Sequence, residues 1–366
     1  MAIKFWEKKE KPSPPKKKKS AVREWADAAM FAVVCATFIR WLTFEAFAIP
    51  SSSMEQSLLT GDYLFVSKLH YGSRTPITPV QVPLTHQTIW GTNLPSFSDI
   101  VQLPSHRLPG FSEVQHNDPV VFNHPEETER PVDLKTYLIK RCIAVAGDTL
   151  QIKQGQVYLN GTPAKTDAKL QFSYFVQTNE YVQEKFFKKH GITDIIPVQG
   201  GYYVHTLPET AQKLRSFDFI KEVISMKAAP GEADPRVFPQ APAQYAWNQD
   251  NLGPLYIPKA GATVAITPAT LPLYEKIIRT YEHNPGVEVR DGKIYQNGKE
   301  LTRYTFQQNY YFMMGDNRHN SHDSRFWGFV PEEYVVGKAV LVWMSSDSAA
   351  NFTDKIRWNR MFHTIN

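Results

Sequence analysis

The sequence predicts a mostly β protein with a single N-terminal transmembrane helix and a mixed α+β insertion in its body. Three observations favour this fold class. One apolar segment follows a lysine-rich N-terminus, short strand-like runs recur after it, and two irregular segments interrupt those runs. With 366 residues, of which 42% are hydrophobic, the chain has enough apolar surface for one elaborated domain or two.

The net charge of +5 is concentrated in a basic tail, residues 1–23, which we expect to be cytoplasmic. This tail contains nine basic and two acidic residues, whereas residues 24–366 contain 32 basic and 34 acidic residues. Its charges are not interleaved with aromatic residues on a folded face, as they are in nucleic-acid-binding surfaces. Two cysteines and scattered histidines do not make a metal cluster. The sequence therefore predicts no nucleic-acid partner, no metal and no cofactor.

The apolar segment after the tail is long enough to cross a lipid bilayer. Trp25–Phe44 is twenty residues interrupted only by Asp27 and Arg40, both near its ends. We predict a transmembrane anchor over residues 24–45, with the body on the extracytoplasmic side because the lysine-rich end stays in the cytoplasm. A buried core helix and a signal peptide cleaved at Ala46–Ala48 are the alternatives.

The body contains short β-patterned runs bounded by Gly, Pro, Asn or Asp, and these predict a β-rich core. The runs are Tyr63–Leu69, Pro119–Phe122, Tyr137–Val145, Gln151–Tyr158, Tyr310–Met314 and Lys338–Met344. We expect the core to comprise residues 46–163 and 287–350. Residues 351–366 would then form a C-terminal tail.

Two segments interrupt this core. Residues 72–115 contain six prolines and no helical periodicity, which predicts a loop insertion. Residues 164–286 are mixed and predict an inserted lobe; its expected helices are Pro208–Ser225 and Pro272–Tyr281. The flanks of this lobe echo each other, because Gln151–Gly161 and Glu288–Gly298 share Gly, Tyr and Asn-Gly in register. Both flanks are typical of tight hairpins.

Three segments contain candidate chemical groups. Ile49–Leu58 is a serine-rich run directly after the anchor, and Tyr137–Asp148 contains Lys140 within an otherwise apolar strand. Gly315–Gly328 is a polar loop that follows an apolar strand. Taken singly, these patterns are also typical of a turn, a strand lysine that points to solvent, and a hydrated loop.

Together the three segments resemble the type I signal peptidases, the membrane-bound serine proteases that remove signal peptides from exported proteins. The most specific match is GDNRHNSHDSRFWGFVP, whereas residues 72–115 and most of 164–286 are unexplained by the resemblance. The resemblance implies Ser53 as nucleophile and Lys140 as general base. It also implies a bacterial inner-membrane location with a periplasmic catalytic domain, and preprotein signal peptides with small residues at positions −1 and −3 as substrates.

The resemblance assigns supporting roles to six further residues. Ser51 matches a side-chain donor to the oxyanion, and Ser321 matches the hydroxyl that orients the lysine. The supporting charge pairs are Arg141 with Asp316 and Asp323 with Arg325. The chain departs from the family at Met54–Ser57, where Met-x-Pro-Thr is common, and at Ala146, where Pro is common.

The proposed base requires a particular environment. A lysine of ordinary pKa is almost entirely charged at neutral pH, so Lys140 must be buried among apolar neighbours without a carboxylate in direct contact. The alternative function is a membrane-anchored binding or assembly protein whose protease-like domain is inactive.

Overall fold

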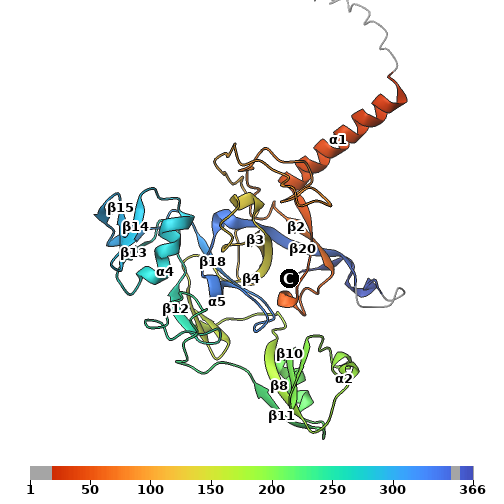
Figure 1. The fold of residues 1–366 in the computed structure, drawn as a ribbon, viewed down its shortest axis with the longest axis vertical. Helices are drawn as coiled ribbons and strands as arrows, with labels where there is room; N and C mark the ends of the chain where they lie inside the picture. The colour runs from red at the N-terminus through yellow and green to blue at the C-terminus, as the bar shows by residue number, and fades with distance from the viewer. Residues whose placement is uncertain (1–18, 348–354, 366) are drawn as a thin grey trace, which may run out of the picture.

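The computed structural model describes residues 19–347 and 355–365, so most of the predicted basic tail lies outside the described residues. The fold is mostly β, as the sequence predicts, with one long apolar helix that projects from the body (Figure 1). This helix is α1 (Ala21–Leu42); it has no buried residues and a mean hydropathy of 1.4 over its most apolar window. Its length and composition suffice to cross a bilayer.

Helix α1 ends earlier than predicted because the chain turns directly into a sheet. Thr43 leaves helical geometry at φ −121°, and strand β1 (Phe44–Ala48) begins at the next residue. The last turn of α1 is tied to the body: Trp41 Nε1 donates to Arg74 O at 2.7 Å, and Ser73 Oγ donates to Leu42 O at 2.5 Å. Glu45, at 5% exposure, accepts from Arg40 and pairs with Lys68.

The main sheet is antiparallel and combines strands that are distant in the sequence (Figure 1). Its order is β1, β2 (Asp62–Ser67), β20 (Val335–Ser345), β3 (Pro119–Asn123), β4 (Tyr137–Ala144), β18 (Tyr310–Met314) and β19 (Val330–Pro331), with β21 (His363–Thr364) added beside β20. These strands confirm five of the predicted runs. Short 3-10 helices occur at Ser52–Met54 (η1), Val132–Leu134, Glu332–Tyr334 and Trp358–Arg360.

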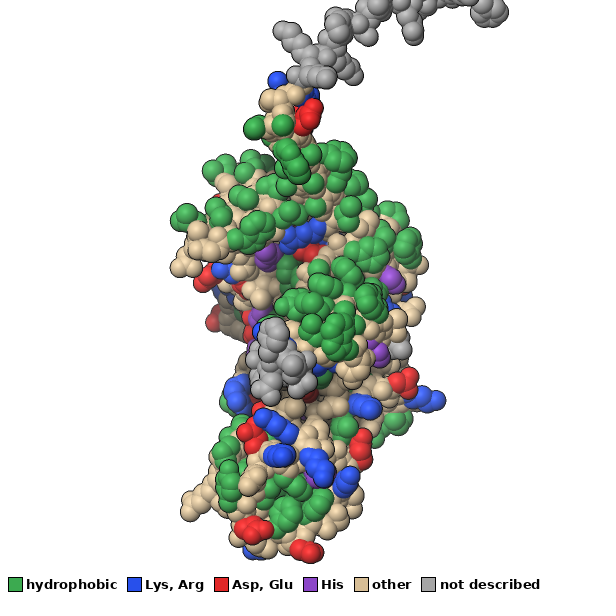
Figure 2. Space-filling view, turned by 90° about the vertical axis from the view of Figure 1, so that its right-hand side faces the viewer, with side chains coloured by type: hydrophobic (Ala, Val, Ile, Leu, Met, Phe, Trp, Pro, Cys, Tyr) green, Lys and Arg blue, Asp and Glu red, His purple; other side chains and the backbone are tan. Residues whose placement is uncertain are grey.

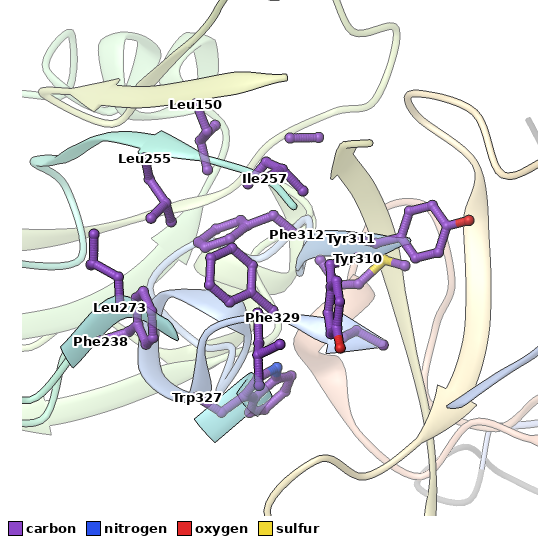
Figure 3. Packing of buried hydrophobic residues seen from close by; sticks show 14 of the residues in the cluster. Leu150, Phe238, Leu255, Ile257, Leu273, Tyr310, Tyr311, Phe312, Trp327 and Phe329 are labelled. Carbon is purple, nitrogen blue, oxygen red and sulfur yellow. The ribbon is translucent and has the colours of Figure 1, made fainter. Parts of the chain in front are cut away.

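The sheet packs against two apolar clusters. The larger one joins β18 and β12 (Leu252–Tyr256) to the helix α5 (Ser324–Trp327), and Figure 3 shows Phe312, Phe329 and Leu255 packed in it. The smaller cluster contains Met54 and Leu58, so the serine-rich run is fixed by apolar contacts on both sides of its polar residues.

The two echoing segments fold as predicted, as similar hairpins. The first contains β5 (Thr149–Lys153), β6 (Gln156–Leu159) and β7 (Thr162–Pro163); the second contains β14 (Val287–Arg290), β15 (Lys293–Gln296) and β16 (Lys299–Glu300). The first turn of each has positive φ at two successive residues, 49° and 76° at Gln154 and Gly155 and 49° and 70° at Asp291 and Gly292. This geometry matches the twist of a two-residue hairpin and favours glycine at the second position.

Within residues 164–286, one stretch has a sheet and an apolar core of its own. The strands are β11 (Ile220–Ser225), β8 (Phe172–Thr178), β10 (Gly201–Thr206) and β9 (Ile195–Val198), in that order, with the helices α2 (Glu184–Lys189) and α3 (Pro208–Leu214). The predicted helix Pro208–Ser225 is therefore wrong in its second half. Ile220 and Val223 are buried in the lobe core as part of a strand that pairs with β8, and this tertiary pairing overrides the local helical pattern.

The rest of residues 164–286 joins the larger cluster of the body. The predicted helix Pro272–Tyr281 is present as α4 (Leu271–Lys276), which continues as a π-helix over Ile277–Tyr281. The remaining strands, β13 (Thr263–Ala265) and β17 (Arg303–Thr305), pair with each other.

Candidate active site

Ser53 and Lys140 meet beside the central strand β4 of the main sheet, although 87 residues separate them in the sequence. Ser53 lies in η1, shortly after β1, and Lys140 lies in the middle of β4. Lys140 Nζ is 2.5 Å from Ser53 Oγ. The predicted nucleophile and base are therefore within direct hydrogen-bond distance.

Lys140 is buried, at 5% exposure, between β3 and β18 on its two sides. None of the described carboxylates forms an ion pair with it. Burial lowers the pKa of Lys140 to about 8, and the more distant Asp323 and Asp316 only partly oppose this shift. Removing the ammonium from water disfavours its charged form, so a neutral amine is accessible near physiological pH.

Ser51 and Ser321 differ in burial and in their contacts. Ser51 is exposed, and its Oγ is 3.5 Å from Ser53 Oγ. Ser321 is buried, and no hydrogen bond joins it to Lys140 in the part of the chain that the structure describes. A Cβ on Gly315 would lie 2.3 Å from Ser321 Oγ and 2.5 Å from Ser53 O. Gly315 therefore lets the polar loop approach the serine segment closely.

Two buried ion pairs fix the loop that follows β18. Arg141 donates to both oxygens of Asp316, at 2.9 and 2.8 Å, and so connects this loop to β4. Arg325 donates to both oxygens of Asp323, each at 2.8 Å. Burial opposes ionisation of Asp323, but the neighbouring Arg325 guanidinium holds its pKa below the usual value. The four supporting residues predicted from the sequence thus form two buried ion pairs.

Other residues of the same two segments join this network, although the sequence did not single them out. Asn317 N donates to Ser53 O at 3.1 Å, and its side-chain nitrogen donates to Ser52 O at 3.3 Å. Asn320 Nδ2 donates to Ser52 Oγ at 3.1 Å, and Ser57 Oγ donates to Asp316 at 2.6 Å. Their position inside the polar motifs was the available signal, but residue type alone does not indicate which atoms they contact.

The backbone conformation at Met54–Ser57 differs from one that the family's common Met-x-Pro-Thr pattern could adopt. Ser57 N donates to Met54 O at 3.1 Å, which closes a turn in which Gln56 has φ 76°. Proline is restricted to φ near −65° and could not adopt this conformation. The family's common proline is thus incompatible with the turn in this chain.

Comparisons with known proteins show the family of this chain. The family described as "Signal peptidase, peptidase S26" matches residues 22–205 and 260–344. A Signal peptidase I of Buchnera aphidicola is 28% identical over 318 residues, covering 86% of this chain and 72% of that protein. The Signal peptidase I of Haemophilus influenzae is 26% identical, and the match covers 92% of this chain and 74% of that protein. That of Helicobacter pylori is 25% identical, and the match covers 91% of this chain and 89% of that protein. The chain therefore belongs to the signal peptidase family, peptidase S26.

Proposed function

We propose that this protein is a membrane-anchored serine endopeptidase that removes N-terminal signal peptides from exported preproteins, with Ser53 as nucleophile and neutral Lys140 as general base. The observation that carries the proposal is the 2.5 Å contact between Lys140 Nζ and Ser53 Oγ at a buried lysine. Peptidase activity on signal peptides is in keeping with the relatives, which are named Signal peptidase I.

In the proposed reaction, a side chain or backbone group of this site takes part in each step of peptide-bond hydrolysis. Lys140 Nζ accepts the proton of Ser53 Oγ as that oxygen attacks the scissile carbonyl carbon. The backbone N–H of Ser53 and the hydroxyl of Ser51 donate to the resulting oxyanion. Protonated Lys140 then gives its proton to the leaving amine, and water hydrolyses the acyl-enzyme with Lys140 again acting as base.

The surface next to α1 supports a membrane location. Figure 2 shows hydrophobic side chains gathered over the part of the body beside this helix. Exposed apolar residues in the segment 72–115 are Val80, Val82, Trp90, Leu94, Ile100, Val101, Leu103, Leu108 and Phe111. We propose that α1 spans the cytoplasmic membrane of a bacterium, that the basic tail stays in the cytoplasm, and that the body rests on the opposite surface.

The β1 pairing also argues for a retained anchor. Ala46–Ala48 is paired with β2, and Ala46 lies opposite Phe65. Cleavage after Ala48 would remove β1, an edge strand of the main sheet. Protease protection of inverted and right-side-out vesicles, with N-terminal sequencing of the protected chain, tests both the orientation and the intact anchor.

Cleavage of a purified preprotein by the full-length chain in detergent tests the proposed activity. We expect a single cut directly after a small residue at position −1 when position −3 is also small. Replacing alanine by phenylalanine at position −1 of the preprotein should abolish the cut, because a shallow pocket rejects bulk by steric clash. A protein that binds both preproteins and cleaves neither would instead be the inactive binding protein.

The pKa of Lys140 predicts the pH dependence of this cleavage. With a pKa of about 8, roughly one lysine in ten is neutral at pH 7, against about one in three thousand at the ordinary value. Because only the neutral amine accepts the serine proton, kcat/KM should rise about tenfold per pH unit below pH 8 and level off above it. A pH profile of kcat/KM for a short peptide substrate measures this midpoint. A flat profile between pH 6 and 9 would contradict the assignment of the base.

A further inference from the structure

A second polar site lies in a groove that contains neither Ser53 nor Lys140. The groove has a volume of about 920 Å³ and is formed by the hairpin β5–β6, the segment 164–170, and residues at the start of β8 and α3. Its floor includes Arg318, from the loop that also contacts Ser53. One loop therefore contributes to both the groove and the candidate active site, but the groove lining includes neither Ser53 nor Lys140.

Arg318 is a buried arginine in the lining of this groove. The residue is 2% exposed, and its Nε and one terminal nitrogen, Nη1, have no hydrogen-bond partner among the described residues. It also forms no ion pair with any described carboxylate. Burial lowers the pKa of Arg318 to about 10, so the side chain is still charged at neutral pH. A buried, unpaired charge is costly, which makes a missing anionic partner the natural explanation.

The nearby carboxylates are already engaged. Asp316 is held by Arg141, and Asp323 is held by Arg325, each through two hydrogen bonds. These two pairs leave Arg318 as the third guanidinium of a cluster that contains two carboxylates. Of these three arginines, Arg318 is the one that lines the groove.

The groove lining as a whole is more basic than acidic. Four basic side chains line it (Lys165, Lys169, Lys227 and Arg318) against two acidic ones (Asp167 and Glu209). Lys227 Nζ lies 4.5 Å from the centre of the Phe172 ring and donates to Gln154 O at 2.9 Å, so its ammonium is held at the groove wall. Apolar residues such as Leu170 and Phe172 complete the lining.

We propose that this groove binds a small molecule carrying a phosphate or carboxylate group, whose oxygens accept hydrogen bonds from Arg318 while the apolar wall contacts the rest of the molecule. A planar guanidinium suits such two-oxygen recognition. The backbone of Arg318 donates to Gln171 O at 2.9 Å, and the preceding Asn317 N donates to Ser53 O. The ligand would therefore stabilise the loop that supports the nucleophile.

Titration calorimetry and thermal unfolding of the full-length chain in detergent test the proposal without relying on cleavage. Inorganic phosphate and acetate serve as the probes, with chloride at matched ionic strength as the reference. We expect saturable binding of phosphate, acetate or both, with one site per chain, and a higher Tm with the anion that binds. The two arms distinguish a phosphate from a carboxylate ligand.

The Arg318→Met variant should bind that anion about tenfold more weakly or worse, the loss expected when a charge-assisted hydrogen bond is removed. It should unfold in anion-free buffer at a Tm no lower than that of the parent, because an unpaired buried charge has been removed. Lys169→Met, at an exposed groove wall, is a second variant that should weaken binding without changing the fold.

Arg236→Met is the matched control, because Arg236 is exposed and does not line the groove. It should bind the anion like the parent. Absence of saturable binding for both anions overturns the proposal, and so does unchanged affinity in both groove variants. Because neither readout depends on peptide cleavage, a failure here is distinguishable from a failure of the proposed protease activity.

Discussion

Replacing Lys140 by Met should lower the rate of preprotein cleavage by about ten-thousandfold while leaving the fold intact. Methionine fills a similar volume but cannot accept the proton of Ser53 Oγ, which lies 2.5 Å from the lysine nitrogen. The fold should survive because a buried amine is replaced by an apolar side chain of similar length. Single-turnover cleavage of a preprotein, with the Tm of each protein measured in parallel, checks both expectations.

Lys135 provides a matched control for this substitution. It is also buried, burial also lowers its pKa, and its Nζ donates to Tyr334 OH at 2.8 Å rather than to Ser53. Lys135→Met should therefore retain most of the activity, although it removes a lysine of similar environment. Equal loss of activity in both variants would mean that Lys140 acts through stability and not as the base.

Replacing Ser53 by Ala should abolish cleavage, because the hydroxyl proposed to attack the carbonyl carbon is removed. The variant should still bind the preprotein, since only one oxygen is removed from a partly exposed position. Mass spectrometry of the preprotein after prolonged incubation measures the residual cleavage, and co-purification in detergent measures the binding.

The other two serines of the run give graded comparisons. Ser51→Ala should leave a measurable remnant, because losing one oxyanion donor typically costs about a hundredfold to a thousandfold in rate. Ser52→Ala should cost less, since Ser52 Oγ accepts from Asn320 and does not contact Ser53 Oγ in the described structure. Activity of Ser53→Ala equal to that of the parent would refute the proposed nucleophile.

The parts of this fold that the sequence predicts are those with a local signal. Strands such as Tyr310–Met314 and Lys338–Met344 are apolar runs between turn residues, and both are present as β18 and within β20. The paired hairpins follow from their glycine and Asn-Gly turns. The resemblance to a family predicted Ser53 and Lys140 as partners, and in the structure their side chains lie 2.5 Å apart. Their catalytic roles stay a prediction.

What the sequence did not predict depends on pairing over long distances. Ile220–Ser225 became a strand because β8 offered a partner edge, which no local pattern reveals. The contact between Asn317 N and Ser53 O likewise depends on how two distant loops pack. Among the described residues, Ser321 forms no hydrogen bond to Lys140. The orienting role of Ser321 is therefore a prediction from the resemblance alone.

The junction between α1 and β1 limits where this protein can act. Only Thr43 separates the helix from the sheet, and the hydrogen bonds of Trp41 and Leu42 with the body restrict bending at this junction. With α1 embedded in a bilayer, Ser53 would be held at a constant height above the membrane surface. Selection among exported chains would then depend on how far a cleavage site lies from the membrane surface as well as on its small residues.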